Sequence, residues 1–351
     1  MVILGIESSC DETAAALVED GRRILANVVS SQIAIHRPYG GVVPELASRQ
    51  HLKVIIPVVR EALAKADKAL ADVDALAVTR GPGLVGSLLV GIGVAKGMAY
   101  ATGKPLVAVN HLEGHIQAAF LEKQPPRFPL VALVVSGGHT NLYHLENYAK
   151  CILVGRTRDD AAGEAFDKVA KFLGLGYPGG IVIDKLSQSG NPAAVDFPRA
   201  YLEKDSLDFS FSGLKTAVVN LVRRYSNSGS GADEQSERTV ISLESLPLNV
   251  ADIVASFQEA VVDILVHKTI RAARNLAVHE IVVAGGVAAN SRLRQKMQEE
   301  ASALGLGVRL PEPALCTDNA AMIAAVAYHR ILPGGHKWDL DFDAISRWPD
   351  G

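Results

Sequence analysis

Apolar runs that end in polar turns recur along the chain and predict strands. One apolar run covers residues 2–7, and a second covers 13–18 after the polar turn at 8–12. A similar unit covers 130–145, where the turn Ser136-Gly137-Gly138 separates two apolar runs. Short apolar runs bounded by polar or glycine residues are typical of strands. Two strand–turn–strand units, each opening one half of the chain, favour a duplicated topology.

The segments between and after these units alternate between helical and strand patterns. Helical periodicity is expected over 50–64, 87–102, 160–173, 251–277 and 318–330, and buried strands over 75–79, 104–109 and 280–284. Alternating strands and helices predict α/β layers. A chain of 351 residues is long for one hydrophobic core and fits two domains.

Composition places the chain among folded globular proteins, since 48% of its residues are hydrophobic and 21% are charged. Its three cysteines are far apart and odd in number, which argues against a disulfide framework. No signal peptide opens the chain, and no apolar run approaches the ~20 residues that span a bilayer. We therefore expect a cytoplasmic protein without a membrane segment. Because the net charge is −3, nucleic-acid binding would need a local basic patch or a partner.

Two histidines suggest a metal site. His111 and His115 lie in the segment HLEGH, and residues four apart share one face of a helix. The strand expected before them would bring the helix start to the sheet edge where α/β sites form. The alternative is a pair of ordinary surface or capping histidines. Spacing alone does not decide between the two.

The same segment invites comparison with zinc proteases. Their catalytic glutamate directly follows the first histidine, so that it reaches the metal-bound water. Glu113 comes one position later, rotated by roughly 200° from His111 on a helix. It should point away from the metal, which argues against proteolysis by that mechanism.

A carboxylate is the usual third ligand beside two imidazoles for zinc or iron. Asp318, in the segment CTDN, offers one. It stands at an expected helix start, so the alternative is that it serves only as a helix N-cap.

Glycine-rich turns follow two of the apolar strands, at Ser136-Gly137-Gly138 and at Gly285-Gly286, and a further pair stands at Gly179-Gly180. Glycine lets the backbone approach a phosphate or base closely. None of these turns matches the dinucleotide fingerprint or the P-loop. They favour a nucleotide site of another type.

Four carboxylates stand near expected turns or on expected helices: Asp11, Glu12, Asp167 and Asp184. Most such groups are solvated. Asp11 and Glu12 are the more suggestive pair, because they form a tight turn directly after a buried strand. Apolar neighbours predict a buried environment for Asp184, where a carboxylate needs a partner such as a ribose hydroxyl.

Nine ordered segments of the chain resemble one family, the tRNA threonylcarbamoyl-adenosine transferases of the bacterial type. The segments are GIESSCDETAAALV, GGVVPELASRQH, TRGPGLVGSLLVGI, NHLEGH, LVVSGGHT, GEAFDKVAKFLGLGYPGG, FSFSGLKTAV, VAGGVAANSRLR and CTDNAAMIA. They extend from residue 2 to about residue 330.

The resemblance implies an α/β fold of the actin-like, sugar-kinase-like and Hsp70-like ATPase type (ASKHA), with duplicated RNase-H-like domains. The first domain would cover 1–110 and be completed by helices at about 316–335. The second would cover 111–315, followed by a tail at 336–351. A polar insertion at about 226–246 looks longer than the family pattern usually allows, and we expect it to affect a surface or a partner contact.

The resemblance also implies a set of site residues. His111, His115 and Asp318 would bind one Fe²⁺ ion per subunit, or Zn²⁺. Asp11 and Glu12 match acidic positions near the reaction centre. The substrate contacts would be Val134, Val135, Ser136, Gly137, Gly138, Asp167, Gly180, Asp184 and Asn290.

The implied reaction transfers the threonylcarbamoyl group from threonylcarbamoyl-AMP to N6 of adenosine 37, in tRNAs that read codons beginning with A. AMP is released. We expect Asp11 or Glu12 to accept the N6 proton. Rival hypotheses are a metalloprotease, an ATPase or chaperone of the same fold, and a binding-only paralogue, which would be expected to lack the histidines.

The implied partners are a TsaB-like paralogue and a TsaE-like ATPase. Three arginine pairs are candidates for phosphate contacts or for an ordinary charged surface: Arg156/Arg158, Arg223/Arg224 and Arg292/Arg294.

Overall fold

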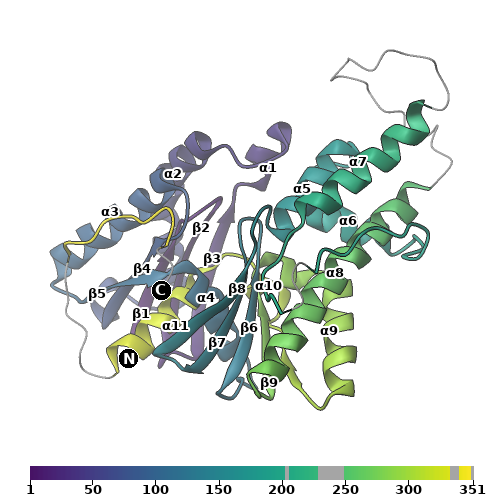
Figure 1. Cartoon of the computed structure of the whole chain (residues 1–351). Helices are drawn as coiled ribbons and strands as arrows, with labels where there is room; N and C mark the ends of the chain where they lie inside the picture. Colours follow the sequence, from purple (N-terminus) through teal and green to yellow (C-terminus); the bar gives the residue numbers. More distant parts are fainter. Residues whose placement is uncertain (202–204, 228–248, 333–339, 349–351) are drawn as a thin grey trace.

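Two mixed β-sheets form the centre of the protein (Figure 1). The computed structural model describes residues 1–201, 205–227, 249–332 and 340–348. The first sheet contains β1 (Val2–Glu7), β2 (Glu12–Glu19), β3 (Arg23–Ser31), β4 (Ala75–Gly81) and β5 (Leu106–Asn110). The second contains β6 (Leu130–Val135), β7 (Thr140–Asn147), β8 (Lys150–Arg156), β9 (Glu280–Ala284) and β10 (Gly307–Arg309).

The two sheets share one topology. Their strand orders are β3-β2-β1-β4-β5 and β8-β7-β6-β9-β10. In each sheet the first three strands of the chain pair antiparallel, and the last two add in parallel. The duplication expected from the two strand–turn–strand units is therefore confirmed at the level of topology.

Helices cover both faces of the first sheet. On one face, α2 (Pro44–Lys65) and α3 (Val85–Thr102) pack against Leu4 and Ile6 of β1. On the other, α11 (Ala320–Ile331) packs against Ile3. A strand buried on both faces reads as a continuous apolar run, which is why β1 shows no alternation of polar and apolar residues.

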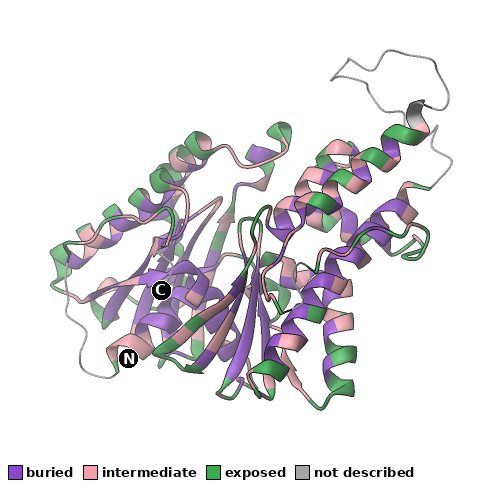
Figure 2. Cartoon of the chain, viewed as in Figure 1, coloured by how far each residue is buried: buried purple, intermediate pink, exposed green. Residues whose placement is uncertain are grey.

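The second sheet is covered in the same way, and Figure 2 shows its central strands buried. Phe166 of α5 (Ala162–Phe172) and Phe257 of α8 (Val250–Asn275) belong to one core cluster with Val131 and Leu133 of β6. The same layer of the molecule includes α6 (Gly179–Ser187), α7 (Ser212–Asn227) and α9 (Ser291–Ala303). Short elements complete the chain: α1 (Ile33–His36), η1 (Arg37–Tyr39), η2 (Leu70–Asp72), η3 (Ala119–Leu121), η5 (Gly286–Ala289) and α10 (Pro313–Cys316).

Helix α4 (His111–Ala118) connects the two halves. Its Leu112 and Ile116 pack into the core on the other face of the second sheet. A Cβ atom added at Gly114 would lie 3.0 Å from Ile323 and 3.2 Å from Met322, both on α11. This close approach places α4 between α11 and the second sheet, so residues on α4 are fixed relative to both halves.

Several element boundaries differ from the sequence-based expectations. Helix α2 begins at Pro44, and the final helix begins at Ala320 with Asn319 as its N-cap. Gly179 and Gly180, which were expected to lie in a turn, begin helix α6, and the rest of that helix was not predicted. Strands β3, β8 and β10 and helix α7 were not predicted.

Some predictions are not tested by the structure. The domain limits at 110 and 315 remain predictions, as does the insertion at 226–246, most of which lies outside the described residues.

Residues 340–348 of the predicted tail pack on the first half of the molecule. Phe342 and Ala344 contact the core beneath α2 and α3, and the Ile345 amide donates to the Arg80 carbonyl at 2.9 Å.

Among the described residues, only α3 is long and apolar enough to cross a membrane, with a mean hydropathy of 1.3 over 18 residues. This differs from the expectation that no such run exists. Core helices of globular proteins pass the same test. Leu88, Ile92 and Ala95 of α3 belong to the core against the first sheet.

A substitution at Gly163, in the first turn of α5, tests how tightly this helix packs against the turn after β6. A Cβ atom there would lie 2.5 Å from the Ser136 carbonyl oxygen, so Gly163→Ala forces backbone to move. We expect a loss of about 1–3 kcal/mol in the free energy of unfolding, measured by urea denaturation. Gly213→Ala on α7 is the control, because no atom lies within 4 Å of its added Cβ. Equal stability of the two variants would contradict this account of the packing.

Candidate active site

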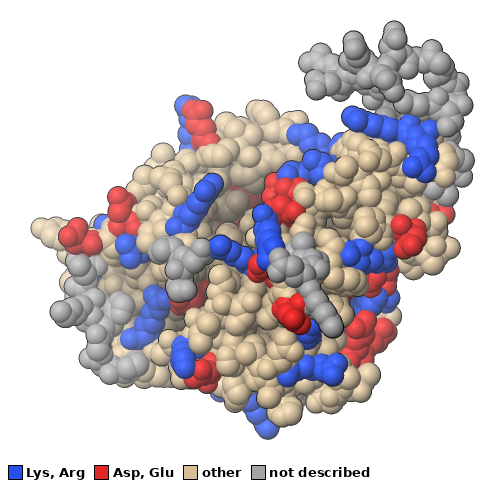
Figure 3. Space-filling view, viewed as in Figure 1, with Lys and Arg blue, Asp and Glu red and all other residues tan. Residues whose placement is uncertain are grey.

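A cavity of about 980 Å³ lies between the two halves of the molecule. The space-filling view shows this face hollowed there (Figure 3). Its wall is formed by the turn after β1, the turn after β6, the facing ends of α5 and α6, η5, and the segment before α11. Because β1 and β6 are the equivalent strands of the two sheets, the polar turns that follow them meet at one site.

His111, His115 and Asp318 form a compact cluster beside this cavity. Asp318 Oδ1 lies 3.4 Å from His111 Nε2 and 3.2 Å from His115 Nε2. The potential ligand atoms of the three residues lie within 4.8 Å of one another. Metal–ligand distances of about 2.1 Å in a tetrahedral site separate neighbouring ligands by about 3.4 Å. The cluster therefore has the spacing of a metal-binding triad.

His115 supplies a second indication that the cluster fits a metal. Its side chain is fully buried, yet neither ring nitrogen makes a hydrogen bond, although Asp318 is near. Buried polar atoms without partners are rare because their desolvation is uncompensated. A cation bound between His115 and Asp318 would satisfy the ring nitrogen, and imidazole with carboxylate is a donor set typical of zinc and iron.

Glu7, at the end of β1, orients His111 and was missed by the sequence-based reasoning. Its Oε2 lies 3.1 Å from His111 Nδ1 and accepts a hydrogen bond from the Thr79 hydroxyl at 2.5 Å. Its Oε1 accepts from the Ser9 amide. Because the carboxylate accepts, Nδ1 of His111 carries the proton and Nε2 is left to face Asp318. A carboxylate behind a ligating histidine is the usual support of a metal site.

Electrostatics in the cluster follow from burying two carboxylates. Burial favours the neutral imidazole of His111, but the charges of Asp318 and Glu7 outweigh it and raise the pKa of His111 well above its usual range. Burial opposes ionisation of Asp318, yet the adjacent histidines hold its pKa far below normal. A divalent cation would balance the charges of Glu7 and Asp318 with both histidines neutral.

Glu113 lies on the same helix but takes no part in the cluster. It pairs with Arg330 of α11, whose guanidinium donates to Glu113 Oε2 at 2.5 Å. As predicted, Glu113 takes no part in the cluster of His111, His115 and Asp318. The zinc-protease arrangement needs this carboxylate beside the metal, and Glu113 does not provide it.

Asp11 and Glu12 both line the cavity, as expected for the turn after β1. Burial raises the pKa of Glu12 to about 7, an effect that the Ser31 hydroxyl reduces and the charge of Asp11 reinforces. The second carboxylate oxygen of Glu12 is buried and has no partner. Burial and the charge of Asp318 also raise the pKa of Asp11. The turn thus places a carboxyl group at the cavity that can gain or lose a proton near neutral pH.

The predicted glycine turns meet on the opposite side. Ser136, Gly137 and Gly138 line the cavity, and Gly285, with φ of 91°, sits so close to β6 that an added Cβ would lie 2.4 Å from the Val135 carbonyl oxygen. Only glycine fits such a position.

Not every predicted residue of this group reaches the cavity. The side chains of Val134 and Val135 are buried in the core of the second sheet, so only their backbone could contact a substrate. His139, which was not predicted, does line the cavity, and burial together with the nearby histidines lowers its pKa to about 4.

The remaining predicted contacts also line the cavity: Asp167, Gly180, Asp184 and Asn290. Three of them also have hydrogen-bond partners within the protein: Asp167, Asp184 and, as described below, Asn290. Asp167 accepts from the Gly179 amide at 2.7 Å, and Asp184 accepts from the Ser291 hydroxyl at 2.8 Å. The Asp184 side chain is only partly buried, so the expectation of a buried environment is wrong. Its apolar neighbours lie on different sides of α6, and Ile181 is 66% exposed.

Comparison with known proteins decides the family. The sequence pattern described as TsaD, tRNA N6-adenosine threonylcarbamoyltransferase, matches residues 23–325. A protein of that name from Syntrophobacter fumaroxidans is 55% identical over 349 residues, which cover 99% of this chain and 100% of the relative. The chain belongs to the tRNA N6-adenosine threonylcarbamoyltransferase family. A further member, from Moorella thermoacetica, is 56% identical over 330 residues, covering 94% of this chain and 92% of its own.

More distant structures share the fold of this threonylcarbamoyltransferase family member. Full-length HypF superposes with a TM-score of 0.61 at 13% identity, covering 95% of this chain and 47% of HypF. Component A of (R)-2-hydroxyglutaryl-CoA dehydratase from Acidaminococcus fermentans superposes with a TM-score of 0.52 at 18% identity, covering 94% and 98% of the two chains. At such identities the likeness concerns the two-domain α/β fold alone.

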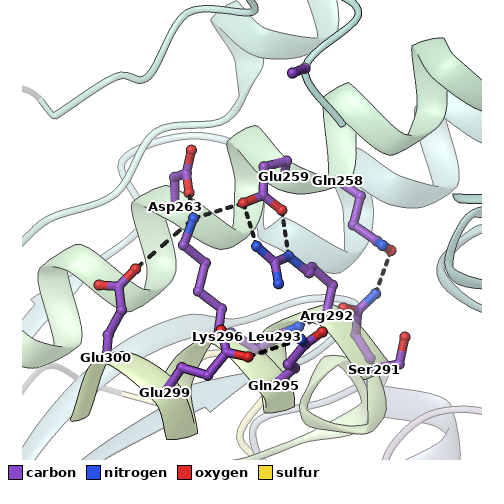
Figure 4. A network of polar contacts seen from close by, with 12 residues as sticks. Gln258, Glu259, Asp263, Ser291, Arg292, Leu293, Gln295, Lys296, Glu299 and Glu300 are labelled. Atoms are coloured by element: carbon purple, nitrogen blue, oxygen red, sulfur yellow. Dashed lines mark hydrogen bonds and ion pairs between the residues drawn. The ribbon is translucent and has the colours of Figure 1, made fainter. Parts of the chain in front are cut away.

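Arg292, one member of a predicted arginine pair of this threonylcarbamoyltransferase family member, belongs to a network of polar contacts between α8 and α9 (Figure 4). Arg292 makes two hydrogen bonds to the carboxylate of Glu259, at 2.6 and 2.8 Å. Arg294 donates to the carbonyl oxygens of Ala288 and Pro311. Both guanidinium groups are therefore engaged inside the protein, which argues against their role as phosphate contacts.

The same network fixes Asn290. Its amide nitrogen donates to Gln258 at 2.7 Å, and its oxygen caps α9 by accepting from the Leu293 amide. One amide hydrogen of Asn290 is left for any ligand of the cavity.

Glu7→Gln tests the support of His111. The amide cannot accept from His111, Thr79 and Ser9 as the carboxylate does, so His111 should lose its fixed orientation. We expect metal affinity to fall about 10- to 100-fold, measured by titrating the apoprotein with Zn²⁺ or Fe²⁺ in a calorimeter. Glu113→Gln is the matched control on the same helix, α4, and should bind metal as the unchanged protein does. Equal affinities for the two variants would refute the role of Glu7.

Proposed function

We propose that this protein transfers the threonylcarbamoyl group of threonylcarbamoyl-AMP to N6 of adenosine 37 in tRNAs that read codons beginning with A. The observation that carries this proposal is the 55% identity to a named threonylcarbamoyltransferase across the length of both chains. The cavity supports it, because a nucleotide-sized space joins glycine turns, two carboxyl groups and a cluster of potential metal ligands.

We propose that His111, His115 and Asp318 hold one Fe²⁺ ion per subunit, with Zn²⁺ as the alternative. Such an ion would act as a Lewis acid and template for the oxygens of the acyl donor. Glu7 keeps Nε2 of His111 directed at the ion site, and Asp318 supplies the anionic ligand.

Glu12 is the better candidate for the group that accepts the N6 proton. In the transfer, N6 of adenosine forms a bond to the carbamoyl carbon, the bond from that carbon to the phosphate oxygen of AMP breaks, and N6 loses one proton. An exocyclic amine is a poor nucleophile, so positioning and proton removal during bond formation both contribute. The Glu12 carboxylate has an oxygen without a partner and a pKa of about 7, which suit it to this task.

The turn Ser136-Gly137-Gly138 and residues Asp167, Gly180, Asp184 and Asn290 would bind the nucleotide portion of the acyl donor. The turn offers backbone N–H groups to phosphate oxygens. Asp184 keeps acceptor capacity beyond its bonds to Ser291, which fits a ribose hydroxyl.

We infer further that the two sheets are the RNase-H-like halves of an ASKHA fold. The support is their equal strand order and the meeting of their equivalent turns at one cavity. A TsaB-like paralogue and a TsaE-like ATPase remain predictions from the family resemblance, and a cytoplasmic location remains a prediction from the cysteines and the apolar pattern of the sequence. The metalloprotease hypothesis is not favoured, given the pairing of Glu113 with Arg330.

Reconstitution tests the proposed function. Purified protein, its TsaB-like and TsaE-like partners, metal, threonylcarbamoyl-AMP and unmodified tRNA are combined, and the nucleosides are analysed by mass spectrometry. We expect threonylcarbamoyl-adenosine at position 37 and an equal amount of AMP. A control without acyl donor should give none. Absence of the modified nucleoside from the complete mixture would refute the proposal.

Glu12→Gln tests the proton acceptor. Because burial raises the pKa of Glu12, the carboxylate fraction, and with it kcat, should rise as pH increases through about 7 and level off above it. Glu12→Gln should lower kcat about 10²- to 10⁴-fold and remove this pH dependence. Asp11→Asn is the matched comparison within the turn and should retain the rise of kcat with pH, moved to a lower pH because the charge of Asp11 no longer raises the pKa of Glu12. If Glu12→Gln kept full turnover, another group would have to take the proton.

A further inference from the structure

Two buried histidines lie beside the turn that contains Asp11 and Glu12, called the acidic turn below. They do not belong to the cluster of potential metal ligands. His51 of α2 and His36 of α1 have no exposed surface. Neither enters the proposed reaction, and neither reaches the cavity, which is lined nearby by Ile33, Gly41 and Val42. Buried imidazoles need partners for both ring nitrogens, so their contacts show which parts of the chain they hold together.

His51 binds the acidic turn at both of its ends. Its Nε2 lies 2.9 Å from the carbonyl oxygen of Cys10, and its Nδ1 lies 2.7 Å from the hydroxyl of Thr13. Because the carbonyl can only accept, Nε2 must carry the proton, and Nδ1 then accepts from Thr13. The neutral ring with the proton on Nε2 satisfies both contacts. The residues between the two anchored positions are Asp11 and Glu12.

His36 fixes the adjoining wall of the cavity by the same logic. The Val43 amide donates to His36 Nδ1 at 3.3 Å, so Nε2 carries the proton and donates to Gln32 Oε1 at 3.2 Å. The backbone amide of Gln32 in turn donates to the carbonyl of Asp11 at 3.1 Å. The acidic turn, the segment 33–43 and the start of α2 are thereby connected through two neutral rings.

We propose that His51 is a positioning residue that holds the Asp11–Glu12 turn in place for proton transfer. Its donation to Cys10 fixes the peptide directly before Asp11. Its contact with Thr13 fixes the first strand position after Glu12. The proposal rests on the proposed function, since it assigns the cause of Glu12's placement in that reaction.

Charged and titratable groups around His51 come from several elements. Burial lowers the pKa of His51, and the hydrogen bond to the Cys10 carbonyl and the carboxylates of Glu7 and Asp11 act in the opposite direction. The net direction agrees with the neutral ring that the two hydrogen bonds require.

Two substitutions separate the contacts of His51. In His51→Gln the amide nitrogen takes the place of Nε2 and can donate to Cys10, while the acceptor for Thr13 is lost. In His51→Asn the amide oxygen takes the place of Nδ1 and can accept from Thr13, while the donor to Cys10 is lost. We expect His51→Gln to keep kcat within about threefold and His51→Asn to lower it about 10- to 100-fold, since small misplacements of reacting groups have effects of that size.

A merely structural role would predict a different pattern. Positioning of the acidic turn should leave KM for threonylcarbamoyl-AMP, metal affinity and the unfolding temperature of His51→Asn near those of His51→Gln. His267→Asn, on an exposed histidine of α8, controls for the substitution itself. Equal kcat values for the two His51 variants would overturn the proposal. An inactive unchanged protein would instead refute the proposed function, so the two failures are distinguishable.

A spectroscopic measurement covers the case in which the variants do not fold. Long-range ¹H–¹⁵N spectra of the histidine-labelled full chain report the protonation and tautomer of each ring. We expect His51 to be neutral with its proton on Nε2 at about pH 6, below the usual histidine pKa of about 6.5. A proton on Nδ1, or a charged ring at that pH, would overturn the proposal without any activity measurement.

Discussion

The hydrogen bonds of one buried carboxylate, that of Glu7, determine how the candidate active site is assembled. A carboxylate with no exposed surface is stable only when donors surround it, and the Ser9 amide, the Thr79 hydroxyl and His111 supply them. These donors come from the turn after β1, from β4 and from the first residue of α4. Because one charge needs all three, it brings the ends of two strands and the start of a helix to one point. The direction of His111 Nε2 toward Asp318 follows from this arrangement.

The duplicated topology explains why the polar turns converge. The central strand of each sheet is buried on both faces, so its polar residues are displaced to its ends. The carboxyl ends of β1 and β6 point to the same cavity, one followed by an acidic turn and the other by a glycine turn. Helix α4 holds the two halves at this separation through the close contact of Gly114 with α11. The carboxyl groups and the glycine turn of the candidate site thus come from equivalent places in two sheets of the same topology.

Much of this could be predicted from local sequence, but not the parts that depend on tertiary contacts. The paired histidines and the misplacement of Glu113 follow from helical spacing, and both predictions agree with the structure. Asp318 could not be separated from a capping residue by sequence alone, because the N-cap lies one residue later than expected, at Asn319. Glu7 did leave a signal, an acidic residue ending an otherwise apolar strand, but its partners are up to 104 residues away. Helix α6 was hidden because its first two residues, a glycine pair, are typical of a turn.

Two carboxyl groups that line the same cavity, those of Asp318 and Glu12, have pKa values shifted in opposite directions. Asp318 is surrounded by imidazoles, which hold its pKa low, so it stays anionic and suits metal ligation. Glu12 lines the same cavity but has a single hydroxyl donor, so burial dominates and its pKa rises to about 7. Environments that push the pKa values of neighbouring acids apart allow one to act as a permanent charge and the other as a proton acceptor. The two proposed roles therefore require that Glu12 remain away from any cation held by the histidines, and its turn is anchored on α2 rather than on α4, the helix that carries them.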